Sequence, residues 1–575
     1  MLKIFAQANL NKAKVCLLLL FIAIQMGGTL YLPTLTADII NNGVVREDLG
    51  YVLRTGAIML GVAILTGIFS ILGTYLGADV ATTFAKNTRK KLFSHTQKLS
   101  CQDFRQFGTS SLITRATNDI EQLQSCLGMF FDMMIPAPFV VVIGMILAFS
   151  RDVYMALIIL AVSLILIAIF CIVVKKVFPL FAKVQLGLDK INGTVAQYIA
   201  GIRVIRAFNR AELEEERMDD AFSDYARVNI RINRIVATMM PVITLFMSLS
   251  AVAIVWFGGL RINSGDMLIG DITAIIEYTM NILMYLIMAV FAAIYVPRAK
   301  VCAGRVMEVL GHQPEIADGH HRIDDDSGLR LEFIDVSFSY QGADNPVLNN
   351  IGFVCEKGTT TAIIGGTGSG KSTVARLILR LIDVSAGEIA VSGVNIKSLA
   401  QEQLRRKMGF APQKAFLFSG TIAENIRHGN KEATMEEVRQ AAITAQADDF
   451  ISEMDDKYDS IVAQGGRNLS GGQRQRLSIA RMLLKKPDIY VFDDSFSALD
   501  LKTDASLRMA LREVTKEAIV ITVAQRISTI RDADQIIVLD EGRLVGKGKH
   551  GQLMESCDVY CEIARSQLSE EELGA

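Results

Sequence analysis

Six long apolar segments occupy the first half of the chain, and they limit its possible folds more than any other feature. They span residues 15–40, 51–80, 127–149, 153–176, 236–262 and 270–296. Each is long enough to cross a bilayer, whose hydrocarbon core needs about 20 helical residues. No small-residue cleavage site follows a short apolar run in the first segment, so that segment is predicted to be retained rather than removed as a signal peptide. The sequence therefore predicts a membrane domain of six helices.

Basic residues distinguish the two sides of these segments. The connections near residues 41–50, 150–153 and 263–270 are short and nearly free of Lys and Arg. Two other loops are rich in them: Lys86, Arg89, Lys90, Lys91, Lys98, Arg105 and Arg115 in one, and Lys175, Lys176, Lys183, Lys190, Arg203, Arg206 and Arg210 in the other. Basic loops favour the cytoplasmic side, so both termini are predicted to be cytoplasmic. Helical periodicity continues through both loops, which indicates helices that project beyond the membrane.

The pattern changes in the second half of the chain. From Leu329 onward, short β-rich apolar runs alternate with charged helical ones, which is typical of an α/β domain. Residues 312–328 are polar and are interpreted as a solvated linker. We therefore expect a membrane domain over 1–311, a linker over 312–328 and an α/β domain over 329–575. The net charge of −1 gives no electrostatic footprint for nucleic acid.

A phosphate-binding loop follows the predicted strand Thr359–Ile364. It comprises Gly365, Gly366, Thr367, Gly368, Ser369, Gly370, Lys371 and Ser372, with Thr373 next in the predicted helix. In such a loop, backbone N–H groups surround the β-phosphate, Lys371 reaches the β and γ oxygens, and Ser372 supplies a hydroxyl to magnesium. Asp493, at the end of a second apolar strand, is a further candidate for holding magnesium. ATP and Mg²⁺ are the predicted ligands.

A second glycine-containing motif opens another predicted helix. Ser470, Gly471, Gly472 and Gln473 stand at its N-terminus, whose partial positive charge suits a γ-phosphate. This motif is highly specific, and the chain resembles a half-transporter of the ABC exporter family over nearly its whole length. The resemblance implies a six-helix membrane domain fused to an α/β phosphate-loop ATPase domain. It also implies that the motif completes the ATP site of a partner subunit.

Three further positions resemble functional residues of that family. The resemblance makes Tyr340 the aromatic residue that stacks on adenine. It makes Gln413, which the resemblance counts among the catalytic residues, the loop glutamine that senses magnesium and contacts the membrane domain. Asp500 ends the loop that crosses between the two ATP sites of a dimer.

Asp494 and Gln525 depart from the family pattern, which has glutamate and histidine at these positions. Aspartate is one methylene shorter than glutamate, and a misplacement of about 1 Å can cost on the order of a hundredfold in rate. Gln525 can hydrogen-bond the γ-phosphate but is never charged. The pair resembles the degenerate-site subunit of bacterial heterodimeric multidrug exporters, which implies a bacterial cell membrane and a companion half-transporter with Glu and His. Drift within a working ATPase is the alternative.

Polar and methionine side chains form a stripe on the sixth segment. At helical periodicity one face carries Thr273, Glu277, Asn281, Met284, Met288 and Tyr295. An ionisable group inside a membrane helix is costly unless it faces a partner or a wet cavity. Glu277, Asn281, Met284 and Met288 are therefore candidate contacts for a cationic small-molecule substrate. In the alternative interpretation, Glu277 lies at the outer lipid boundary or pairs with the other subunit.

Taken together, these features favour a subunit of an ATP-driven exporter of hydrophobic or amphipathic drugs, with lipids as further candidates. The chain's own ATP site is expected to hydrolyse poorly. Two alternatives stay open at this stage. One is an importer with an exporter-type fold, as in some siderophore uptake systems, and the other is a mainly regulatory ATP-binding subunit.

Overall fold

The computed structural model describes residues 11–321, 328–340, 342–343 and 345–567. Its contacts divide the chain into two compact units, formed by residues 1–97 with 109–312 and by residues 98–108 with 313–575. The short segment 98–108, expected in the membrane domain, groups with the second unit. Ser100 donates a hydrogen bond to the carboxylate of Glu315 (3.3 Å), and the Asp103 carboxylate accepts the backbone N–H of Glu315 (3.3 Å). The predicted domain bounds themselves stay a prediction.

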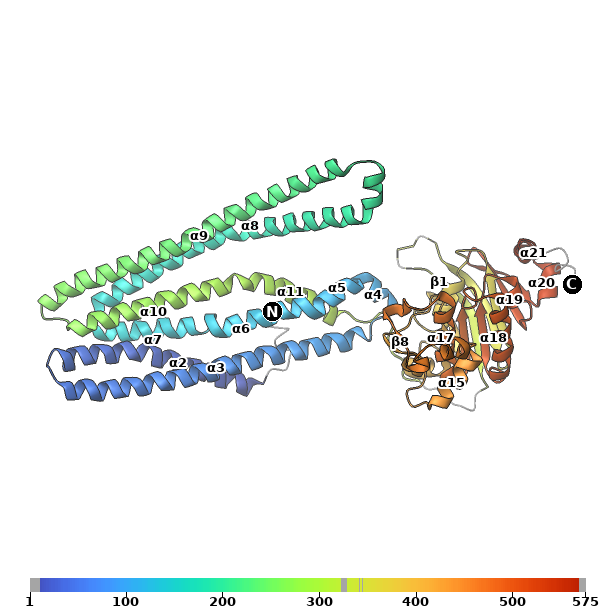
Figure 1. The fold of residues 1–575 in the computed structure, drawn as a ribbon, viewed down its shortest axis with the longest axis horizontal. Helices are drawn as coiled ribbons and strands as arrows, with labels where there is room; N and C mark the ends of the chain where they lie inside the picture. Colours follow the sequence, from blue (N-terminus) through green and yellow to red (C-terminus); the bar gives the residue numbers. More distant parts are fainter. Residues whose placement is uncertain (1–10, 322–327, 341, 344, 568–575) are drawn as a thin grey trace. The chain divides into compact units, whose positions relative to one another are not determined.

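The first unit consists of long helices (Figure 1). Their bounds are α2 Lys12–Asp38, η1 Ile39–Val44, α3 Leu49–Thr96, α5 Thr109–Thr114, η2 Arg115–Asp119, α6 Ile120–Met129, η3 Phe130–Met134, α7 Pro136–Arg151, α8 Val153–Ala207, α9 Ala211–Asn263, α10 Ile269–Ala293 and α11 Tyr295–Gly311. Within the described residues, six helical stretches are long and apolar enough to cross a membrane. The six predicted segments are confirmed.

Several of these helices are much longer than a bilayer requires. The hairpin of α8 and α9 is the clearest case: the two helices run side by side for 55 and 53 residues. At 1.5 Å per residue, α8 is roughly 80 Å long, against about 30 Å for a hydrocarbon core. The predicted extension of the helices beyond the membrane is confirmed.

Ion pairs join the helix ends at the short connections of this unit. The Arg151 guanidinium contacts Asp38 and Asp271, each at 3.0 Å, and Arg261 contacts Asp152 at 2.8 Å. These charges therefore tie α2, α7, α8, α9 and α10 together where the apolar segments end.

The second unit contains the predicted α/β domain, with three sheets. Its strands are β1 Arg330–Phe338, β2 Leu348–Glu356, β3 Thr360–Gly365, β4 Ala386–Val391, β5 Val394–Asn395, β6 Met408–Ala411, β7 Gly420–Thr421, β8 Ile461–Val462, β9 Ile489–Asp493, β10 Ile519–Val523, β11 Gln535–Asp540 and β12 Arg543–Gly548. The main sheet has the order β12-β11-β3-β10-β9-β6, and a second sheet has the order β2-β1-β4-β5. Strands β7 and β8 form a small pair.

Among the described residues of this unit, thirteen helical segments accompany the sheets. They are α4 Cys101–Phe107, α12 Lys371–Ile378, α13 Gln401–Lys407, α14 Ile422–Arg427, α15 Met435–Thr444, α16 Asp448–Ser452, η4 Lys457–Asp459, η5 Gln464–Gly466, α17 Gly471–Leu484, α18 Leu501–Val514, α19 Ile527–Ile530, α20 His550–Ser556 and α21 Asp558–Arg565. A buried cluster that includes Ile363, Val374 and Val491 packs α12 against the main sheet.

The strand order of the main sheet decides where functional groups meet. Strands β6, β9, β10, β3 and β11 are parallel neighbours. The carboxyl ends of parallel strands lie at one edge of a sheet, where ligands of α/β folds bind. Segments that follow β3, β6, β9 and β10 are therefore brought to the same edge.

Candidate functional site

The phosphate-binding loop connects β3 to α12, as predicted, and its glycines are required by its shape. A Cβ at Gly365 would lie 2.0 Å from the carbonyl oxygen of Leu539. Gly370 has φ +98°, and a Cβ there would lie 2.5 Å from Leu348 Cδ2. Other residues would be strained or would clash at both positions, so the backbone can form a tight cradle only with glycine.

Lys371 lies inside this cradle. The side chain is buried, and its Nζ donates to the carbonyl oxygens of Gly365 (2.8 Å) and Gly366 (2.6 Å). Burial lowers the pKa of Lys371, while the nearby carboxylates of Asp494 and Asp493 act in the opposite direction. The ammonium group is thus held by backbone carbonyls at the place where the family motif puts phosphate oxygens.

Ser372 and Asp493 form a pair of oxygen ligands beside the loop. The Ser372 hydroxyl donates to Asp493 Oδ1 at 2.9 Å. Burial raises the pKa of Asp493, and the bond from Ser372 and the charge of Arg376 oppose that shift. A hydroxyl and a carboxylate are the hard oxygen donors that Mg²⁺ prefers. The residues present therefore fit a magnesium ion shared with nucleotide phosphates.

Asp494, immediately after β9, forms the centre of a hydrogen-bonded cluster. Its Oδ2 accepts the amide of Gln413 at 2.9 Å and the amide of Gln525 at 3.1 Å. Asp494 as a whole is 9% exposed, and it has a left-handed backbone with φ +48°, which aspartate tolerates better than most residues. Both amide side chains that are expected to face nucleotide or magnesium thus donate to the Asp494 carboxylate.

Two buried residues that the sequence analysis did not select hold the glutamine loop. Ser495 Oγ donates to the Ala411 carbonyl at 2.6 Å, and Gln475 Nε2 donates to the Pro412 carbonyl at 2.9 Å. Both carbonyls immediately precede Gln413, so these bonds fix the base of its loop. The only sequence signal was proximity: Ser495 follows Asp494, and Gln475 belongs to the same helix start as Ser470.

Tyr340 is anchored near the start of α12. Its hydroxyl lies 3.4 Å from Thr373 Oγ1 and accepts a hydrogen bond from Arg376 at 3.1 Å. Its ring packs edge-on against Phe338, with 4.8 Å between centroids. Arg376 was also missed, although it lies three residues after Thr373 and so on the same face of the helix.

Ser470 begins α17, as the sequence predicted. Its Oγ accepts the N–H of Gln473 at 3.2 Å, and Gln473 Oε1 accepts the N–H of Ser470 at 2.9 Å, which is a complete capping box. Ser470 and Gly471 are exposed, so the positive end of this 14-residue helix is open to a ligand.

Asp500 is likewise exposed and caps α18. Its carboxylate accepts the N–H of Thr503 at 2.9 Å, and this hydrogen bonding lowers the pKa of Asp500.

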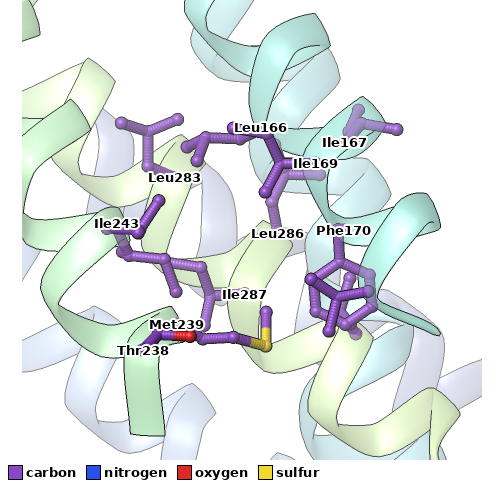
Figure 2. Close-up of a pocket in the computed structure, with 13 residues that line it drawn as sticks. Leu166, Ile167, Ile169, Phe170, Thr238, Met239, Ile243, Leu283, Leu286 and Ile287 are labelled. Carbon is purple, nitrogen blue, oxygen red and sulfur yellow. The ribbon is translucent and has the colours of Figure 1, made fainter. Parts of the chain in front are cut away.

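The candidate substrate residues lie on one side of α10. Glu277 and Met284 are exposed, and Asn281 and Met288 are half-buried. Asn281 donates its side-chain amide to the backbone carbonyl of Glu277 at 2.9 Å. None of the four lines the apolar pocket between α8, α9 and α10, which Leu283, Leu286 and Ile287 enter from a different face of α10 (Figure 2).

Comparison with known proteins assigns both parts of the chain. Residues 15–290 match the family model of the ABC transporter transmembrane region, and residues 348–497 match that of the ABC transporter. An uncharacterized ABC transporter ATP-binding protein of Mycobacterium tuberculosis is 39% identical, and the match covers 96% of each chain. Another from Bacillus subtilis is 37% identical over 96% of each chain.

More distant relatives carry functional names. An ATP-dependent lipid A-core flippase of Vibrio vulnificus is 27% identical, and the match covers 94% of this chain and 93% of the flippase. Among solved structures, a bacterial Atm1-family ABC exporter with ATP bound superposes with a TM-score of 0.82. That match is 23% identical and covers 97% of this chain and 99% of the exporter, so it shows the fold.

Proposed function

The chain belongs to the ABC transporter family, and from this membership we propose that it is one half of an ATP-driven exporter of hydrophobic or amphipathic molecules, with drugs and lipids as candidates. The observation that carries the proposal is six spanning helices on the same chain as a complete phosphate-binding loop. The name of the distant relative, a lipid A-core flippase, supports amphipathic cargo. The protein is accordingly a multi-pass membrane protein with an ABC ATPase domain.

We also propose that the chain's own ATP site hydrolyses poorly. The Asp494 carboxylate is one methylene shorter than glutamate, and its Oδ2 already accepts two amides, from Gln413 and Gln525. Such a group is badly placed to position the attacking water, because small errors in position are costly in rate. Magnesium, held by Ser372 and Asp493 with the phosphates, would supply charge neutralisation for binding. ATP binding and poor hydrolysis are thus compatible at this site.

A companion half-transporter is the partner that this arrangement needs. The exposed N-terminus of α17, with Ser470 and Gly471, is intact and suits the γ-phosphate of a second ATP site. A companion with Glu and His at the positions of Asp494 and Gln525 would create one competent site, completed by this helix. The proposed assembly is a heterodimer in a bacterial cell membrane, with both termini cytoplasmic because the basic loops favour that side.

For cargo, the stripe on α10 is the proposed contact surface for cationic compounds. Glu277 supplies the charge, and Met284 and Met288 supply soft, adaptable apolar contacts. Glu277 and Met284 are exposed and can therefore contact a ligand or a partner subunit.

Transport into inside-out vesicles tests the proposed direction. Vesicles that contain this chain and its companion are expected to accumulate a labelled amphipathic cation, such as rhodamine 6G, when ATP is added outside. Vesicles with Lys371→Ala in this chain and the matching change in the companion should accumulate none. ATP-dependent uptake into right-side-out vesicles loaded internally with ATP would instead identify an importer.

A further inference from the structure

A large apolar cavity lies between α8, α9 and the junction of α10 with α11. Its volume is 660 Å³, within the roughly 300–1,000 Å³ usual for small-molecule sites. Its wall combines aliphatic side chains with four phenylalanines, which are Phe170, Phe178 and Phe181 from α8 and Phe291 from α10. The four candidate substrate contacts Glu277, Asn281, Met284 and Met288 do not line this cavity, although Tyr295, the last residue of the stripe, does. The cavity is therefore a second candidate binding site, in addition to the four candidate contacts on α10, for a molecule that comes from the membrane.

The cavity continues toward the middle of the apolar segments. Phe170, Val173 and Met239 line both the large cavity and the smaller pocket of Figure 2, whose volume is 90 Å³. The small pocket is walled by aliphatic residues such as Leu166 and Leu283, whose side chains Figure 2 shows converging from α8 and α10. From Leu283 to Arg298 the helical rise is roughly 22 Å, which is most of one hydrocarbon core.

One charged side chain, that of Arg298, lines the large cavity. Among the described residues that line the two cavities, Arg298 is the only charged one. It lies just after the sixth apolar segment, at the side of the basic loops, and it is exposed. Within the described part of the chain, Arg298 has no ion-pair or hydrogen-bond partner. The acidic Asp119 of η2 pairs with Arg305 instead.

We propose that the two cavities form an entry site for an amphipathic anion as cargo: Arg298 binds the anionic head, and the aromatic and aliphatic wall binds a single long apolar tail. An unpaired guanidinium beside a wall without acidic residues attracts an anion and disfavours a cation. The inference rests on the proposed export function and names a substrate class for it. The site differs in charge from the surface formed by Glu277, Asn281, Met284 and Met288, none of which lines it, so the transporter would bind cationic and anionic amphiphiles through different residues.

Direct binding to the full-length chain in phosphatidylcholine nanodiscs tests the proposal. The probe is radiolabelled dodecyl phosphate, compared with dodecyltrimethylammonium and with hexyl phosphate. The wild type is expected to prefer dodecyl phosphate over both. Arg298→Gln should weaken dodecyl phosphate binding by about tenfold, the size expected for losing one hydrogen bond between charged groups. Arg298→Lys should retain most of the affinity.

Two further variants separate local binding from general effects. Lys300 lies two residues after Arg298, and its side chain lines neither cavity. Lys300→Gln removes one positive charge, as Arg298→Gln does, but this variant should bind the probe as the wild type does. Val173→Trp fills the shared wall and should abolish the advantage of the dodecyl over the hexyl tail. The proposal would be overturned if Arg298→Gln bound dodecyl phosphate as tightly as the wild type does. It would also be overturned if the wild type bound dodecyltrimethylammonium as tightly as dodecyl phosphate.

Anionic bilayer lipid is the competing occupant with the same chemistry. In nanodiscs that contain phosphatidylglycerol, a cargo site should still bind dodecyl phosphate, whereas complete displacement of the probe would make the cavity a lipid site and refute the proposal. The vesicle transport assay separates the two levels of inference. Absence of ATP-driven transport for every probe would refute the exporter proposal alone, and loss of selective binding would refute only the Arg298 site.

Discussion

Restoring glutamate and histidine at the chain's own ATP site should work only when both are changed. Asp494→Glu extends the carboxylate by about 1.5 Å, one C–C bond. The carboxylate of the single variant would still be held by the amide of Gln525, which now donates to Asp494 Oδ2 at 3.1 Å. Gln525→His alone leaves the short carboxylate in place. Each single variant is therefore expected to gain less than about fivefold in hydrolysis, because each keeps one of the two defects.

The double variant should gain about a hundredfold or more, since one transition-state contact is worth about 2.7–4 kcal/mol. The gain of the double variant should therefore exceed the product of the two single gains by about fourfold or more, which is at least about 0.8 kcal/mol and within the range of coupling energies for residues of one network. The assay is ATP turnover of the assembled pair after the companion's catalytic glutamate is replaced, so that only this chain's site contributes. Gln440→His, on the exposed face of α15, is the control for an added imidazole. Strictly additive gains, or a full gain from either single change, would refute the reasoning.

Three other results follow from the described contacts. Lys371→Ala should weaken ATP binding at this chain's site by about ten- to a hundredfold, because a hydrogen bond to a charged group is worth about 1.5–3 kcal/mol; a fluorescent ATP analogue measures this with the companion site blocked, and unchanged affinity would contradict it. Glu277→Gln should weaken transport of cationic compounds by roughly 1 kcal/mol more than of neutral ones, and equal losses would indicate packing. Because burial raises the pKa of Asp493, protons should compete with Mg²⁺ for its carboxylate at a higher pH than they do at an exposed aspartate. The Mg²⁺ affinity of this site should therefore begin to fall at a higher pH than it would with an exposed aspartate, and Asp493→Asn should abolish that pH dependence.

Features set by local pattern were predictable from the sequence. The six membrane segments follow from apolar length alone, and the strand, glycine loop and helix around Lys371 follow from local composition. The start of α17 was marked by Ser470 with Gln473 three residues later, which is the signature of a capping box.

Features set by strand order were not predictable. Gln413 and Gln525 lie 81 and 31 residues from Asp494 along the chain, and only the neighbouring positions of β6, β9 and β10 bring their amides to its carboxylate. Local sequence pattern assigns each glutamine to nucleotide or magnesium separately, because it does not show that one carboxylate accepts hydrogen bonds from both.

The cavity near Arg298 could not be predicted from the sequence for a different reason. Basic residues at the cytoplasmic ends of apolar segments predict topology, so this arginine had no distinguishing pattern. Its position became informative only once the structure showed that Arg298 lines an apolar cavity together with residues of α8, α9 and α10. The polar stripe with Glu277 was visible because helical periodicity places its members on one face, whereas a cavity shared by several helices has no sequence period.

The central claim is that hydrolysis depends on a companion because this chain's own site is impaired. The direct measurement is the ATPase rate of the purified chain alone and of the chain with its companion, in the same lipid and at saturating ATP. The lone chain is expected to hydrolyse ATP slowly, and the pair about a hundred- to a thousandfold faster, which is the range for one lost transition-state contact. Brisk, cooperative hydrolysis by the lone chain, at a rate that matches the pair, would contradict it.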